Sequence, residues 1–206
     1  MTGNGTILPQ GWRYILPVWG LTLLVLIFSD AILLNLLLIL LSFFAAYLFF
    51  VPNRVPLDSG SEALIAPVDG IVSKIEEKDG AIHLQIKKRL FDVTAVRAPL
   101  DGDVVASEYL HGLFLATDDP KASRLNEQVA IGYRWEDMTI RMRIVCGFYS
   151  FGLPATISEG PVRTGETLAV LSEGGVHLTL PKSLSLAISS GDAVLGGQSV
   201  LARKTV

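Results

Sequence analysis

Few residues of this chain combine a reactive side chain with the spacing that chemistry requires. The histidines lie far apart and lack the spacing of metal ligands (His83, His111 and His177). The single cysteine, Cys146, rules out an internal disulfide and fits a reducing compartment. Within the run IRMRIVCGF we predict that it is a small buried residue. The strongest candidates are instead two polar segments, residues 67–70 (PVDG) and 91–99 (FDVTAVRAP).

These two segments carry charged side chains that are candidate site residues. Asp69 belongs to the first segment, and Asp92 and Arg97 belong to the second. Asp69 has an equally good structural interpretation, because an Asp-Gly pair favours a tight turn.

The first element that must position them is a long apolar stretch, residues 15–51, in which Asp30 is the only charge. We expect two helices, residues 15–28 and 31–51, joined by a turn at Ser29 and Asp30. The second supplies 21 residues, enough to span about 30 Å of hydrocarbon, whereas the first supplies 14 and would be shallow or tilted. A cleaved signal peptide is disfavoured, because the apolar run is too long and no small-residue cleavage site follows it.

Positive charge flanks the apolar stretch on both sides, at Arg13 and Arg54. Positively charged flanks stay in the cytoplasm. We therefore predict a transmembrane helical hairpin in the cell (inner, or cytoplasmic) membrane, with Ser29 and Asp30 on the opposite side. The soluble domain is then expected to face the cytoplasm.

The remaining chain, about 155 residues, is long enough for one soluble domain with a proper core. Its charge pattern argues against one class of partner. The net charge of the chain is −3, and no run of Lys or Arg is longer than three residues. We therefore expect no nucleic-acid partner and no basic run that holds anionic lipid.

After the linker, the pattern is that of short β-strands. Period-2 alternation with frequent Gly and Pro predicts a mainly β fold, of β-sandwich or barrel-sandwich-hybrid type. Residues 116–127 are polar and predict a loop or a short helix. The expected domains are residues 1–51 (N-terminal segment and hairpin), 52–62 (linker) and 63–206 (β domain). The predicted strands are residues 63–65, 70–75, 83–86, 91–98, 103–106, 129–135, 138–146, 167–171, 176–180 and 184–188.

One internal repeat is visible, because residues 162–168 and 194–200 share a turn followed by a strand. This pattern is similar to that of lipoyl-type domains, which carry a cofactor on a lysine at a hairpin tip. No lysine lies between the repeats apart from Lys182, which follows Pro181. A carrier function is therefore disfavoured.

Residues 67–70 and 91–99 resemble the phosphatidylserine decarboxylase family, in the short form that has an N-terminal hydrophobic hairpin. Four further motifs match the family in order, and together the motifs cover nearly the whole chain. Each motif alone is weak, but their order and spacing carry the resemblance. The further motifs are residues 49–54 (FFVPNR), 112–114 (GLF), 126–128 (NEQ) and 141–144 (RMRI).

The resemblance implies an enzyme that makes its own cofactor. Family members cut their chain before a serine, which becomes a pyruvoyl group. The pyruvoyl carbonyl forms a Schiff base with the amine of phosphatidylserine and acts as an electron sink for the loss of CO₂. Asp69 matches the aspartate that the family associates with the cut. Arg97, Asp92 and Phe114 are carried over as substrate-binding candidates.

The sequence departs from the family at two positions that this chemistry needs. The serine of the family's Gly-Ser pair corresponds to Gly174, which has no hydroxyl. The histidine of its Asp-Val-His motif corresponds to Thr94, which cannot transfer protons near neutral pH. Ser172 is a substitute nucleophile only if the cut is shifted to the bond between Leu171 and Ser172.

Our leading hypothesis is a membrane-anchored, non-catalytic member of this family that has no cofactor. It would bind an aminophospholipid or a membrane protein partner, and a headgroup binder should keep a polar pocket around Asp69 and Arg97. One alternative is an active phosphatidylserine decarboxylase that makes phosphatidylethanolamine through a pyruvoyl group. A third hypothesis is an accessory structural subunit of a membrane complex. The sequence does not give the oligomeric state.

Overall fold

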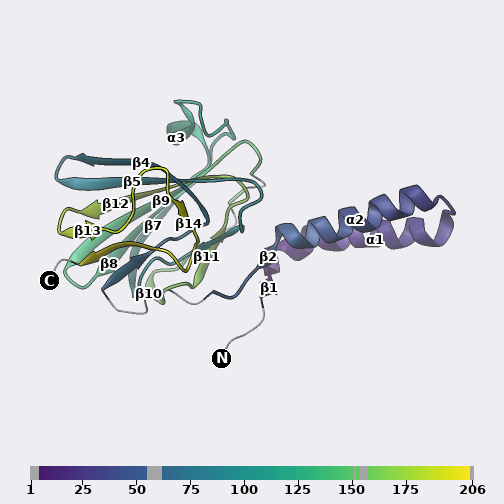
Figure 1. Cartoon of the computed structure of the whole chain (residues 1–206), viewed down its shortest axis with the longest axis horizontal. Coiled ribbons are helices and arrows are strands. Elements are labelled where there is room, and N and C mark those ends of the chain that lie inside the picture. Colours follow the sequence, from purple (N-terminus) through teal and green to yellow (C-terminus); the bar gives the residue numbers. More distant parts are fainter. Residues whose placement is uncertain (1–4, 55–61, 151, 154–156, 205–206) are drawn as a thin grey trace. The chain divides into compact units, whose positions relative to one another are not determined.

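The computed structural model of the chain describes residues 5–54, 62–150, 152–153 and 157–204 (Figure 1). The chain forms two compact units, Met1–Asn53 and Arg54–Val206. The predicted linker, residues 52–62, lies largely outside the described residues. Each unit is described here by itself.

The first unit is a helical hairpin. Two helices, α1 (Trp12–Phe28) and α2 (Ile32–Leu48), follow a short 3₁₀ turn, η1 (Pro9–Gly11). The hydroxyl groups of Thr22 and Ser42 hydrogen-bond at 2.7 Å between the helices. The turn predicted at Ser29 and Asp30 is confirmed, since α1 ends at Phe28 and Ser29 accepts a bond from the side chain of Asn35.

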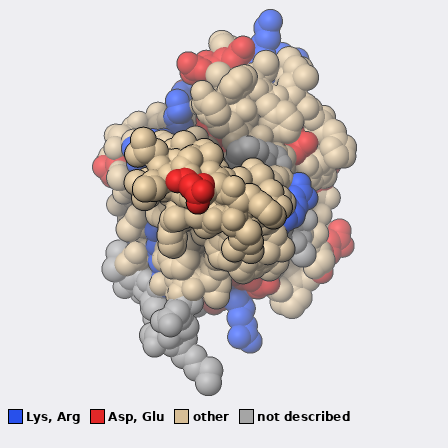
Figure 2. Space-filling model, turned by 90° about the vertical axis from the view of Figure 1, so that its right-hand side faces the viewer, with Lys and Arg blue, Asp and Glu red and all other residues tan. Residues whose placement is uncertain are grey.

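The predicted transmembrane hairpin is wrong. Each helix has 17 residues, and among the described residues no helix is long and apolar enough to cross a membrane. The second helix stops at Leu48 because the next residues pair with the start of the chain. Strand β2 (Phe50–Val51) is antiparallel to β1 (Thr6–Ile7). Figure 2 views the hairpin unit end-on. Within residues 12–48 of this unit, the charged residues are Arg13 and Asp30.

The second unit is built on one antiparallel sheet of eight strands. Along most of this sheet the neighbouring strands are long, and each pairs with its neighbour over seven or eight residues. The turn predicted at Glu136 and Asp137 joins two of them. In order across the sheet the strands are β10 (Gly160–Val162), β7 (Gly102–Leu110), β8 (Gln128–Trp135), β9 (Met138–Cys146), β12 (Gly174–Pro181), β5 (Ala81–Lys88), β4 (Gly70–Lys78) and β14 (Ala193–Val194).

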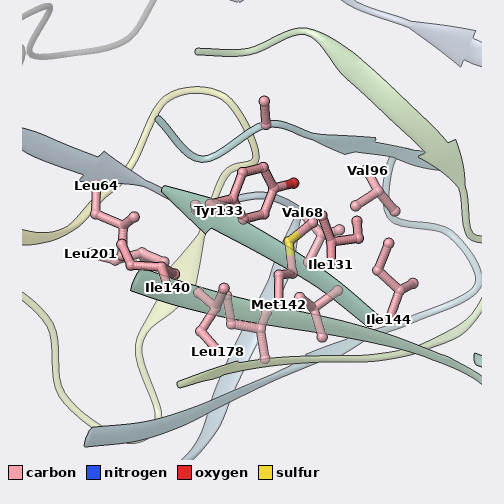
Figure 3. Close-up of a cluster of buried hydrophobic side chains, with 14 of the residues drawn as sticks. Leu64, Val68, Val96, Ile131, Tyr133, Ile140, Met142, Ile144, Leu178 and Leu201 are labelled. Atoms are coloured by element: carbon pink, nitrogen blue, oxygen red, sulfur yellow. The ribbon is translucent and has the colours of Figure 1, made fainter. Parts of the chain in front are cut away.

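Two smaller sheets pack on one face of the large sheet. They are β11 (Thr167–Val170) with β6 (Ala95–Arg97), and β13 (Leu184–Leu186) with β15 (Val200–Lys204) and β3 (Ala63–Ile65). Alternate side chains of the long strands point to this face and are buried. Figure 3 shows them with residues of the smaller sheets, including Leu64, Val96 and Leu201. The prediction of a mainly β domain is confirmed for this unit.

One predicted strand differs from the structure in detail. Residues 91–98 contribute only the short strand β6, because residues 89–92 form a turn closed by the backbone N–H of Asp92. Residues 116–127 contain the short helix α3 (Ala122–Leu125), as expected. The other predicted strands agree within a few residues at their ends, whereas β10, β14 and β15 are not in the predicted set.

Candidate functional site

Asp69 precedes β4, and both of its carboxylate oxygens are occupied. Arg54 donates one hydrogen bond to Oδ1 and a second, of 2.8 Å, to Oδ2. The backbone N–H of Gly196 donates to Oδ1 at 2.7 Å. A bidentate ion pair between an arginine and a carboxylate is both strong and geometrically specific. Asp69 therefore has the partners of a structural anchor that joins three distant segments.

Arg97 lies beside this pair and is buried. Its Nη1 donates a hydrogen bond of 3.1 Å to the carbonyl oxygen of Gly165. Burial and the neighbouring charge of Arg54 lower the pKa of Arg97, whereas Asp69 acts in the opposite direction. The structure thus brings Asp69 and Arg97 together, as the pocket hypothesis expected, but through buried contacts.

The other two substrate-binding candidates lie in separate surroundings. Asp92 accepts hydrogen bonds from the backbone N–H of Arg89 at 2.8 Å and from its Nη2 at 3.0 Å. It therefore closes the turn that follows β5. Phe114 is half-buried and packs against the hydrophobic core. The substrate-binding function of these residues stays a prediction.

Lys88 is a site residue that the sequence analysis missed. It is the last residue of β5, and its side chain is completely buried. Its Nζ donates three hydrogen bonds, to the carbonyl oxygens of Arg89 (3.0 Å), Asp92 (2.9 Å) and Ser172 (2.9 Å). Burial lowers the pKa of Lys88 to about 8, against the opposing charges of Asp92, Asp69 and Glu173.

The sequence did contain one signal for Lys88. Buried residues alternate along β5 with period 2, and Lys88 falls on the same face as the apolar residues before it (Ile82, Leu84 and Ile86). A lysine on the buried face of a strand needs polar partners, because an unpaired charge is costly in a core. The sequence could not supply the identity of those partners.

Leu171 and Thr94 meet at the end of the short sheet formed by β6 and β11. The backbone N–H of Leu171 donates to the carbonyl oxygen of Thr94 at 2.8 Å. Thr94 is buried, and its hydroxyl oxygen has no hydrogen-bond partner among the described residues. Ser172 is also buried. The lysine, the threonine and the serine therefore gather at the ends of β5, β6 and β11.

Gly174 is the first residue of β12 and leaves no room for a side chain. Its φ of +152° is a conformation that residues with a Cβ rarely adopt. A Cβ built at this position would overlap the carbonyl oxygen of Val145 and lie 3.1 Å from the backbone nitrogen of Gly147. Gly174 pairs with Lys88 on one side and with Cys146 on the other.

Glu173 accepts hydrogen bonds from residues 147–150, the segment that follows Cys146. Its carbonyl oxygen accepts the backbone N–H of Gly147 at 2.9 Å and the hydroxyl of Ser150. Its carboxylate accepts the backbone N–H of Tyr149 at 3.2 Å. Cys146 is completely buried, as predicted, and burial raises the pKa of its thiol to about 12. At neutral pH this thiol is not a nucleophile.

Residues 41–202 of the chain match the family model described as phosphatidylserine decarboxylase. The chain is also similar to several curated proteins that are named phosphatidylserine decarboxylase proenzyme. The protein from Carboxydothermus hydrogenoformans is 29% identical over 205 residues, which cover 94% of each chain.

Two further relatives carry the same name. The Salinibacter ruber protein is 31% identical over 171 residues, covering 78% of this chain and 75% of the relative. The Ehrlichia chaffeensis protein is 27% identical over 180 residues, covering 82% of this chain and 79% of the relative. The similarity therefore extends over the β unit and is not confined to one motif.

Proposed function

This chain belongs to the phosphatidylserine decarboxylase family, and from that membership we propose that it is a non-catalytic member that remains uncleaved. It binds an aminophospholipid headgroup and does not decarboxylate it. The observation that carries the proposal is the backbone geometry of Gly174.

The residues at this position do not fit a pyruvoyl group. Such a group forms from a serine, whose hydroxyl must first attack the preceding carbonyl. Gly174 has no hydroxyl, and the carbonyl oxygen of Val145 occupies the place of a Cβ. A serine here would need a local shift of β9 or β12. No step of a pyruvoyl mechanism is therefore assigned to this chain.

Among the described residues, those at the positions of the family's histidine and aspartate do not offer a free base either. Thr94 corresponds to the family's histidine, and its buried hydroxyl is not a proton acceptor near neutral pH. Asp69 is held by Arg54 and by the N–H of Gly196. The Nζ of Lys88 uses three donors on three carbonyl oxygens. General acid–base catalysis typically raises a rate by about 10²–10⁴-fold. Its loss would therefore slow self-cleavage further, in addition to the loss of the serine hydroxyl.

The choice of a phospholipid ligand has two supports. The relatives are named for an enzyme of phosphatidylserine. In addition, α1 and α2 expose large apolar side chains, among them Phe28 (81% exposed) and Leu33 (84% exposed). Contiguous exposed apolar surface is typical of interaction sites. We place the protein at the surface of the cytoplasmic membrane, with the β unit on the cytoplasmic side.

An active enzyme is the competing proposal, and Ser172 is the residue on which it depends. Ser172 is the only hydroxyl-bearing residue in the segment 171–175, and the amine of Lys88 bonds to its carbonyl oxygen. Self-cleavage between Leu171 and Ser172 would then release a fragment of residues 172–206.

The intact mass of the purified full chain separates these two proposals. An uncleaved protein gives one species of 22.3 kDa. A Ser172→Ala variant, prepared in parallel, must give the same single species. Two fragments from the unmodified chain, with a blocked N-terminus on residues 172–206 and no cleavage in Ser172→Ala, would overturn the non-catalytic proposal. Binding of phosphatidylserine vesicles without CO₂ release tests the ligand.

A further inference from the structure

A groove of about 1170 Å³ crosses the face of the large sheet that is turned away from the core. Its floor is formed by the second set of alternating side chains on β5, β12, β9 and β8, and part of its lining is contributed by residues 117–123. We call it the sheet groove. None of the side chains on its floor is needed for the family chemistry discussed above.

Basic and neutral hydrogen-bonding side chains lie next to one another on this floor. Across β5, β12 and β9 the register aligns Gln85, His177 and Arg143 in one row. The next row on the same face contains Thr179 and Arg141, together with His83. Cross-strand neighbours on one face lie within reach of a common small ligand.

The two arginines form no ion pair within the part of the chain that the structure describes. Arg143 is half-buried, and burial lowers its pKa. Burial and the charge of Arg143 lower the pKa of His177 to about 4, so its imidazole is neutral at physiological pH. A partly desolvated guanidinium without a counter-charge is unfavourable, and an anion would relieve that cost.

The strand beside the arginines carries small residues. Ala130 lies opposite Arg143, and Gly132 lies opposite Arg141, in the register of β8 with β9. Both small residues line the sheet groove. Open space therefore adjoins the guanidinium groups on the side where an incoming ligand would lie.

The lining also sets a limit on the size and charge of the ligand. Acidic side chains at the edges of the groove include Glu108, Asp118 and Asp119. A long polyanion such as nucleic acid would meet these carboxylates and be repelled. A compact anion over the arginines avoids them.

We propose that the sheet groove binds a single phosphoryl group, with Arg143 and Arg141 as its charge partners and His177 and Gln85 as neutral hydrogen-bonding groups. Guanidinium groups suit phosphate because they donate paired hydrogen bonds to its oxygens. This site goes beyond the proposed function and does not depend on whether the chain is cleaved. A soluble phosphate compound and a lipid headgroup offer the same chemistry.

The soluble arm of the test titrates the full chain with inorganic phosphate and with glycerol 3-phosphate by calorimetry. Arg143→Gln is expected to raise the Kd by about 10–100-fold, because it removes a charge-assisted hydrogen bond. Arg134→Gln is the matched control, since Arg134 is exposed on β8, lies outside the groove lining and carries the same charge. Ala130→Leu should also weaken binding by filling the space beside Arg143.

The lipid arm measures co-sedimentation with phosphatidylcholine vesicles that contain or lack phosphatidic acid. Loss of the phosphatidic-acid-dependent binding in Arg143→Gln, but not in Arg134→Gln, identifies a lipid headgroup as the source. Binding in the soluble arm alone identifies a soluble ligand. The site is overturned if Arg143→Gln and Arg134→Gln behave alike in both arms. It is also overturned if the unmodified chain binds nothing in the soluble arm and nothing in the lipid arm. Unfolding curves recorded on the same samples show whether a variant that does not bind is misfolded. The intact mass of the same samples shows whether the chain is cleaved, and so tests the proposed function separately.

Discussion

The ammonium group of Lys88 lies 2.9 Å from the carbonyl oxygen of Ser172. This bond joins the buried end of β5 to the segment that immediately precedes β12, where relatives of this protein are expected to cut their chain. Together with the bonds to Arg89 and Asp92, it gives a buried cation three acceptors. The bonds fix the position of Ser172 and so favour a structural purpose for Lys88 over a catalytic one.

The buried ammonium predicts an alkaline change in stability. The folded-state pKa of Lys88, about 8, lies below the ordinary value of 10.5. Between these pH values the unfolded state binds the proton that the folded state has released, so the free energy of unfolding rises with pH. Below pH 8 the full cost of burying the charge remains. The expected gain from pH 8 to 10.5 is about 3 kcal/mol.

Urea unfolding of the wild type and of Lys88→Met at several pH values in this range measures the effect. The variant lacks the rise. The raised pKa values of Cys146 and Tyr109 give the opposite slope, but they are common to both proteins and cancel in the difference. Lys87→Met on the exposed face should retain the wild-type rise, and parallel pH profiles for Lys88→Met and the wild type would refute the prediction.

The Gly174→Ser substitution should destabilise the fold and leave the chain uncleaved. The positive φ and the overlap with Val145 together predict a loss of about 2–5 kcal/mol in the free energy of unfolding. Gly160→Ser is the matched control, because Gly160 also has a positive φ, +132°, but no atom within 4 Å of a built Cβ. Denaturation and intact mass check both variants. A stable, self-cleaving Gly174→Ser protein would contradict the prediction.

The ion pair of Arg54 and Asp69 should contribute a measurable coupling energy. Their side chains are 15% and 10% exposed, and the pair is two-pronged. A double-mutant cycle with Arg54→Gln and Asp69→Asn is expected to give about 1.5–3 kcal/mol. The same cycle on the exposed pair of Lys74 and Glu76 should give less than about 1 kcal/mol. Equal coupling in the two cycles would argue against an anchoring function for Asp69.

The unpartnered hydroxyl of Thr94 predicts a stabilising substitution. Thr94→Val keeps the shape of the side chain and removes a buried polar atom that has no partner among the described residues. We expect the free energy of unfolding to rise by about 1 kcal/mol. Thr164→Val should instead lower it, because the hydroxyl of Thr164 donates to Asp101 at 3.0 Å. Chemical denaturation of both variants decides the sign.

Most of the β unit could be predicted from alternation along the chain. The hairpin that turns at Glu136 and Asp137 is an example, since the burial of its two strands follows their own period of two. The same reasoning overextended residues 91–98, where the side chain of Asp92 closes a turn before the strand begins. The second helix was also predicted to be too long, because the prediction rested on apolar content and composition does not show where a helix ends.

Sequence alone determined what depends on residues a few positions apart: the strand faces, the turn after Phe28 and the ordered motifs of the family. Tertiary structure decided what depends on distant partners. Pairing with Thr6 and Ile7 ends the helical stretch before Phe50. Ser172, 84 positions along the chain, supplies an acceptor for Lys88. The sheet groove likewise exists only because four strands align. Local patterns record each strand's periodicity, but which strands and side chains meet is set by packing free energy summed over the whole fold.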